Sequence, residues 1–154
     1  MRYVQRVLQP EETIVHQSRL HALIFLPALI LLLIALALLV ASGQFADEKI
    51  SIGFEVAAAM FGLLAVASWA RAAIRRATTE LAVTDRRVIY KSGLFARHTL
   101  EMNRSKVESV DVDQSILGRI FGFGTIIVRG TGGSLEPIRL ISDPLSFRSH
   151  ITAS

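Results

Sequence analysis

The chain of 154 residues contains no cysteine. A disulfide framework, a thiol nucleophile and a thiolate metal site are therefore excluded, and redox chemistry gives no information on the compartment. With no cysteine to complete a zinc motif beside the four histidines, we expect no metal and no cofactor. Two of them, His16 and His21, flank the first apolar run, where we expect them at a membrane interface.

Charge is absent from Ala22 to Ala46, where Leu, Ile, Ala and Val dominate. About 20 apolar residues cross a hydrocarbon core roughly 30 Å thick. A second apolar run, Ile50–Ala70, follows a short polar loop. The length of the first run and the presence of a second one favour an uncleaved anchor over a signal peptide. The sequence therefore predicts a hairpin of two transmembrane helices at 22–42 and 50–70.

Basic residues flank this hairpin on its outer ends and set its orientation. By the positive-inside rule, both termini lie in the cytoplasm of a multi-pass protein of the plasma membrane. The loop between the spans carries a single lysine, Lys49. The flanking arginines are Arg2, Arg6 and Arg19 before the first span, and Arg71, Arg75 and Arg76 after the second.

Beyond Arg76 the pattern changes to alternating apolar and polar residues. Turn-forming residues recur between the short β-branched and aromatic runs, which is typical of an antiparallel sandwich or small barrel. The apolar members of the six expected strands are Leu81/Val83, Val88/Tyr90, Leu100/Met102, Val110/Val112, Ile126/Val128 and Ile138/Leu140.

Two segments interrupt the alternation. Residues 115–121 (SILGRIF) predict a short helical turn. Residues 145–151 predict a C-terminal helix with Phe147 and Ile151 on one face, because Asp143 can cap it and Pro144 suits its first turn.

The runs TDRRVIYKSGL (84–94) and VESVDVDQSILGR (107–119), with Gly124-Thr125, resemble the bacterial pleckstrin-homology-like, membrane-flanked domain family. This resemblance implies a strongly bent sheet of about seven strands plus a C-terminal helix. The expected organisation is a cytoplasmic segment at 1–21, the membrane hairpin at 22–70 and the pleckstrin-homology-like domain at 71–154. Only six strands are expected after the spans, so either residues 13–20 complete the sheet or the barrel is open at one corner.

Candidate catalytic groups are few. Asp111 and Asp113 share one strand face, and paired carboxylates can act in acid–base chemistry or bind a metal. We interpret them as the solvent-facing side of a strand instead, because Val110 and Val112 alternate with them. The run GTGG (130–133) lacks the helix and the Lys-Ser/Thr of a phosphate loop and predicts a hairpin turn. We therefore expect that the chain has no enzymatic activity.

Binding is the favoured class of function. Residues 71–154 carry 13 Lys/Arg against 8 Asp/Glu. Cations near an anionic bilayer each contribute on the order of 1 kcal/mol. The best candidates for contact with headgroups or partners are Arg86, Arg87, Lys91 and Arg97.

A second candidate contact is apolar. Ile116, Leu117, Ile120 and Phe121 could form a lip that touches the bilayer or a partner, although we favour the interpretation that they fill the core of the domain itself.

The function favoured by the sequence is a non-enzymatic scaffold that presents its domain at the cytoplasmic face of the bacterial inner membrane for self-assembly or partner binding. Binding of anionic lipid headgroups is the alternative, and a membrane enzyme that uses Asp111 and Asp113 is a third. The expected partners are membrane lipids, further copies of the chain and other membrane proteins, but not nucleic acid.

Overall fold

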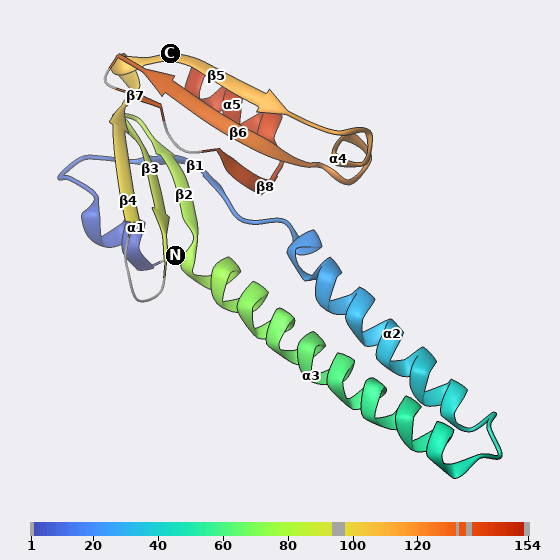
Figure 1. Cartoon of the computed structure of the whole chain (residues 1–154). Coiled ribbons are helices and arrows are strands. Elements are labelled where there is room, and N and C mark those ends of the chain that lie inside the picture. Colours follow the sequence, from blue (N-terminus) through green and yellow to red (C-terminus); the bar gives the residue numbers. More distant parts are fainter. Residues whose placement is uncertain (1, 94–97, 132, 135–136, 153–154) are drawn as a thin grey trace. The chain divides into compact units, whose positions relative to one another are not determined.

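The structure, a computed structural model, describes residues 2–93, 98–131, 133–134 and 137–152 (Figure 1). Its contacts divide the chain into two units. One unit, which we call the domain, comprises Met1–His21 together with Arg75–Ser154. The other, Ala22–Ile74, is inserted between these two parts, and we call it the helical hairpin. The domain is therefore discontinuous in sequence.

The helical hairpin contains η1 (Ala22–Phe25), α2 (Leu26–Ser42) and most of α3 (Glu48–Thr78), whose last turn belongs to the domain. Pro27 lies in the first turn of α2, where its missing amide donor is tolerated. Two helical stretches, at 22–42 and 48–78, are long and apolar enough to cross a membrane, and little of either is buried within the protein. They coincide with the runs that predict the two spans.

The buried residues of both long helices have small side chains. They recur every seven residues, which places each set on one stripe of its helix. Close approach of two apolar helices favours such small side chains. Aromatic pairs lie at both ends of the hairpin, Phe25 with Trp69 and Phe45 with Phe54. The buried residues are Ala28, Ala35 and Ser42 in α2, and Ala58, Ala65 and Ala72 in α3.

The first sheet of the domain has four antiparallel strands in the order β1-β2-β3-β4. Strand β1 precedes the helical hairpin and β2 follows it. Of the two alternatives left by the sequence, the segment at 13–20 therefore does contribute a strand. The strands are β1 (Ile14–Ser18), β2 (Glu80–Thr84), β3 (Arg87–Ser92) and β4 (His98–Asn103).

The second sheet is built around β6, which pairs with β5, β7 and β8, all antiparallel. The sheets and the C-terminal helix fit the expected fold class, whereas closure into a barrel or sandwich stays a prediction. The strands are β5 (Val107–Asp113), β6 (Phe123–Gly130), β7 (Gly133–Ser134) and β8 (Ile138–Ser142); η2 (Arg104–Lys106) precedes β5, and α4 (Ile116–Phe121) joins β5 to β6 (Figure 1).

The C-terminal helix α5 (Pro144–Thr152) contacts strands of both sheets: β1 and β2 of the first, β5 and β6 of the second. Phe147 and Ile151, which the sequence predicts to share one face of a helix, are both buried. Leu81, Ile126 and Ile141 are also fully buried. The core of the domain therefore lies between the sheets and α5.

One further helix, α1 (Arg2–Val7), was not foreseen from the sequence. Val4 is buried in one cluster with Ala82 and Ile89. The carboxylate of Glu80 accepts the Val4 amide at 3.1 Å and the Tyr3 amide at 3.5 Å. Negative charge at a helix N-terminus is stabilising, so Glu80 holds α1 against the first sheet.

Candidate functional site

Both connections between the domain and the helical hairpin leave from the same end of the first sheet. Ser18, the last residue of β1, pairs with Leu81, the second residue of β2. Because the two strands are antiparallel neighbours, the chain leaves the domain after β1 and re-enters it before β2 at one end of this sheet. We call this the exit end of the domain.

The second sheet reaches the exit end through the residues that follow β1. Leu20 forms an isolated bridge with Ile141 of β8, and the His21 amide donates to the Leu140 carbonyl at 2.6 Å. The ring centroids of His21 and Phe123 are 5.4 Å apart. Phe123 begins β6 directly after α4, so α4 also belongs to the exit end.

Helix α4 is a short turn that is capped at both ends. Ser115 Oγ accepts the Gly118 amide at 3.1 Å, and Gly122, with a φ of 70°, donates its amide to the Gly118 carbonyl. Gly118 is buried, and a Cβ there would lie 2.6 Å from the Phe123 carbonyl oxygen. The residue of α4 that packs against the rest of the domain is therefore a glycine, which has no side chain.

The four large apolar side chains of α4 consequently face solvent. Their exposed fractions are 79% for Ile116, 60% for Leu117, 70% for Ile120 and 56% for Phe121. The interpretation that they fill the core of the domain is therefore wrong. They form an exposed apolar surface, which we call the α4 tip. Full burial of one such side chain contributes about 1.5–3 kcal/mol, so covering the tip would be strongly favourable.

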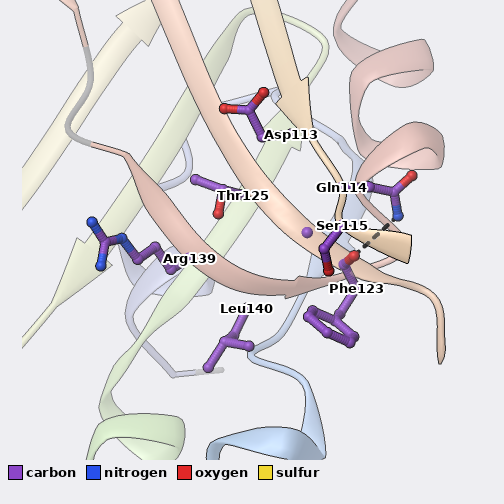
Figure 2. Close-up of a pocket in the computed structure, with 8 residues that line it drawn as sticks. Asp113, Gln114, Ser115, Phe123, Thr125, Arg139 and Leu140 are labelled. Atoms are coloured by element: carbon purple, nitrogen blue, oxygen red, sulfur yellow. Dashed lines mark hydrogen bonds between the residues drawn. The ribbon is translucent and has the colours of Figure 1, made fainter. Parts of the chain in front are cut away.

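A pocket of about 450 Å³ opens at the exit end, between β5, the start of β6 and β8. Figure 2 shows the side chains around it. Ser115 and Phe123, which flank α4 in the chain, both belong to its wall. The lining residues are Asp113, Gln114, Ser115, Phe123, Gly124, Thr125, Arg139 and Leu140.

The pocket lining combines one cation, Arg139, with one carboxylate, Asp113, and several hydrogen-bonding groups. The Arg139 side chain is exposed on β8, and Thr125 and Asp113 are register partners on β6 and β5. Gln114 Nε2 donates to the Phe123 carbonyl at 3.0 Å and so fixes one wall (Figure 2). Arg139 is the group of this lining that would hold an anionic ligand, through charge-assisted hydrogen bonds, and Asp113 would oppose it.

The structure does not gather the basic residues singled out by the sequence. Arg86 and Arg87 lie at the turn between β2 and β3, which is opposite the exit end. Lys91 lies near the other end of β3, paired with Glu80. At about 3.3 Å per residue, four residues separate Arg87 from Lys91 by roughly 13 Å. Arg97 lies outside the described residues.

Arg87 is engaged within the domain. Its Nε and Nη2 atoms donate to the two carboxylate oxygens of Glu12, at 2.9 and 2.8 Å. Further bonds reach the Glu101 carboxylate and the Val7 carbonyl. The Glu12 side chain is fully buried, and that of Arg87 is 12% exposed. Because these bonds occupy the guanidinium within the domain, Arg87 is a poor candidate for a headgroup contact.

The carboxyl group of Glu12 is strongly acidic in this setting. Hydrogen bonding to Arg87 lowers its pKa from 4.5 to about 2 and outweighs burial, which acts in the opposite direction. The Gln9 amide and the Thr84 hydroxyl donate to the same carboxylate at 2.8 and 2.7 Å. Glu12 therefore ties the segment before the hairpin to the β2–β3 turn.

The other two described members of the basic set differ in their surroundings. The Arg86 side chain is exposed. Lys91 is half-buried, with its Nζ 5.1 Å from the centroid of the Tyr3 ring, a distance that suits a cation–π contact. Arg86 thus remains a candidate surface contact, at the end of the sheet opposite the exit end.

The geometry of Asp111 and Asp113 gives little support to a catalytic carboxylate pair. Asp111 Oδ2 accepts the Arg129 Nε–H at 2.9 Å, with both side chains about half exposed. Asp113 lies instead at the edge of the pocket. Within the part of the chain that the structure describes, no three His, Cys, Asp or Glu residues gather as a metal site would require. Asp111 is already paired, which weakens the enzyme hypothesis.

A pair of stacked histidines, His16 and His150, is not predicted by the sequence. The His16 and His150 rings stack with centroids 4.4 Å apart, and the Phe147 ring lies 6.0 Å from His16. Burial, followed by the charge of His150, lowers the pKa of His16, whereas the charge of Asp143 opposes this shift. His16, a residue of β1, thus packs against α5, whereas the sequence suggests a position at the membrane interface for it. No local signal marks this contact, because its partners lie at opposite ends of the chain.

Comparison with known proteins places these features in context. The model of a protein family described as the bacterial PH domain matches residues 20–154. No curated protein and no solved structure matches the chain. The matched stretch includes both long apolar helices, all strands from β2 to β8 and the C-terminal helix.

Proposed function

Because the chain belongs to the bacterial PH domain family, we propose that it is a membrane-anchored binding and assembly module without catalytic activity. Domains of this type are generally binding modules. In this proposal the domain stands at the cytoplasmic face of a bacterial inner membrane, and the two apolar helices hold it there.

The pairing of β1 with β2 is the observation that carries the proposal. Strand β1 precedes both apolar helices and β2 follows them, yet the two are hydrogen-bonded neighbours. Glu12 and Arg87 are joined across the same insertion. An odd number of membrane crossings would leave these partners on opposite faces. A helical hairpin with two crossings keeps them together.

The arginine distribution supports a cytoplasmic domain. Arg19 and Arg71 to Arg76 flank the helices on the domain side, whereas the loop between α2 and α3 carries Lys49 with Asp47 and Glu48. Basic residues are retained on the cytoplasmic side of membrane helices.

Assembly is supported by the edges of the first sheet. β1 and β4 are its outer strands, and β4 is mostly exposed. Unpaired strand edges are templates for association with another chain. Confinement to a membrane also raises the effective concentration of copies without any new contact. The partners proposed here are further copies of this chain or other membrane proteins.

Binding of anionic lipid headgroups is a second candidate function, and the pocket at the exit end favours it. Arg139 offers an exposed guanidinium there, beside the connections to the apolar helices. A cation near an anionic membrane surface contributes about 1 kcal/mol, so this contact would orient the domain rather than anchor it.

Reporter fusions test the proposed topology. A reporter that is active only outside the cytoplasm should be silent when fused after Ser154 and active when fused at Asp47. The reverse pattern would rule out a cytoplasmic domain, and activity at both positions would rule out the two-crossing hairpin.

Assembly is tested by the mass of the complex in lipid nanodiscs over a broad range of protein-to-lipid ratios. We expect masses of two or more copies, with lipids retained. A strictly monomeric mass at every ratio would contradict self-assembly.

A further inference from the structure

The α4 tip is an uncovered apolar surface in a domain whose other large side chains are mostly packed. Four of the six residues of α4 are Ile, Leu or Phe with more than half of their surface exposed. Caps at Ser115 and Gly122 fix the helix, and the buried Gly118 fixes which face turns inward. The outward direction of the tip is therefore built into the fold.

The tip lies at the end of the domain from which the chain continues into the first apolar helix. His21 is the last residue before the apolar stretch that begins at Ala22, and its ring contacts the Phe123 ring. Phe121, at the end of α4, lies two residues from Phe123, which is at most about 7 Å along the chain. The tip therefore lies near His21, the last residue of the domain before the first apolar helix.

The charges around the tip suit a membrane surface. Arg119 lies within α4 and is exposed, and no acidic residue occurs in the helix. An acidic residue close to the helix in the fold is Asp143, whose amide donates to the carbonyl of Gly122 at the end of α4. Arg19 and Arg139 are exposed at the same end, on either side of the bridge between Leu20 and Ile141. Apolar side chains flanked by arginines match the boundary between acyl chains and phosphate groups, where short amphipathic elements lie in the plane of the membrane.

We propose that the α4 tip inserts into the interfacial layer of the bilayer leaflet that the first apolar helix enters. This inference rests on the proposed membrane-anchored function and adds a third membrane contact to the two helices. Insertion fixes the tilt of the domain and brings the pocket that holds Arg139 to the level of the lipid headgroups. A second copy of the chain is the competing occupant of the tip.

The absence of cysteine makes a direct test possible with the full-length chain. Three single-cysteine variants, I120C, L33C and S105C, are labelled with the same nitroxide and placed in lipid nanodiscs. Ile120 and Leu33 are 70% and 56% exposed, so neither change disturbs a packed core. Ser105 is exposed in η2, at the far end of β5 from α4, and controls for the tendency of the label itself to enter lipid.

Collision of the nitroxide with oxygen, which concentrates in lipid, and with a water-soluble nickel complex is then measured for each variant. We expect the label at position 120 to collide with the nickel complex several-fold less often than the label at 105, and to approach the oxygen accessibility seen at 33. Equal nickel accessibility at 120 and 105 would overturn the inference.

The controls separate this failure from others. If the label at 33 is itself accessible to the nickel complex, the membrane-anchored function fails and the inference fails with it. If 33 is shielded and 120 is not, only the inference fails. Strong spin–spin broadening at 120 that grows with the protein-to-lipid ratio, without oxygen accessibility, would assign the tip to a second copy and would also overturn insertion.

Discussion

Glu12 and Arg87 form a two-point ion pair across the inserted helices, with Glu12 Oε2 2.8 Å from Arg87 Nη2 and Oε1 2.9 Å from Nε. Thr84 and Gln9 complete the hydrogen bonding of the carboxylate. The pair joins the segment before the hairpin to the strands after it. Arg87, which the sequence suggests as a surface cation, therefore helps to hold the domain together.

Replacing Glu12 should therefore strongly destabilise the domain. E12Q removes the buried counter-charge of the Arg87 guanidinium and leaves it only the more exposed Glu101 carboxylate. Removal of one partner of a buried pair costs about 3–5 kcal/mol. Denaturant unfolding of the full chain in detergent measures the loss. E11Q is the matched control, because Glu11 is exposed. Equal unfolding midpoints for the two variants would mean that the pair contributes nothing.

The stability of the domain should fall as the pH drops below about neutral. His16 has a pKa lowered from 6.5, so the unfolded chain binds the proton more readily than the folded domain does. This contribution is fully present above 6.5 and declines as the pH falls through 6.5 toward the lowered value.

H16Q should flatten this pH dependence between about 7.5 and 5.5, because glutamine does not titrate. H98Q, at an exposed position on β4, is the control and should keep the slope of the unchanged chain. Thermal unfolding at several pH values gives the comparison. A slope that survives in H16Q would assign the effect to another group.

A side chain at position 118 should displace α4. The Cβ of G118A would lie 2.6 Å from the Phe123 carbonyl oxygen, a backbone atom that cannot easily move. Overpacking of this kind costs about 1–3 kcal/mol. Amide hydrogen exchange in β6 and α4 should increase in G118A and stay unchanged in G62A, where the structure leaves space around a Cβ. Unchanged exchange in both would show that α4 adapts freely.

The two ends of the domain should differ in lipid binding. R139Q should reduce the number of anionic lipids that stay bound to the full chain during native mass spectrometry. R86Q, which changes an exposed arginine at the opposite end, should leave that number unchanged. A loss in R86Q alone would restore the β2–β3 turn as the headgroup contact.

This comparison needs the full chain. A fragment limited to residues 71–154, the range that the sequence suggests for the domain, would lack β1 and α1 and would leave Arg87 without Glu12.

The elements of the domain were predictable where the signal is local. Alternation marks β5 and β6 because each buries one face, with Val110, Ile126 and Val128 turned inward. The same holds for α5, where Phe147 and Ile151 are one helical turn apart. A proline and a capping residue at its start are also local signals.

The features of the candidate site were less predictable because they depend on distant contacts. Arginine in a hairpin looks the same whether it is exposed or paired, and the partner of Arg87 is 75 residues away. Apolar residues in α4 suggest burial, but the direction of the helix is set by the space between Gly118 and the Phe123 carbonyl, which no sequence period reveals. Helix α1 is short and depends on Glu80.

The separation of Glu12 from Arg87 also sets an order of events during biosynthesis. At about 5–20 residues per second, a ribosome needs roughly 4–15 s to synthesise the chain between them. For most of that interval β1 has no neighbouring strand, because both apolar helices are synthesised before its partner β2. In the proposed topology, insertion of the hairpin therefore precedes closure of the first sheet. A nascent chain that inserted only one helix would leave β1 and β2 on opposite sides of the membrane. The first sheet could then not close, and the domain would stay unfolded.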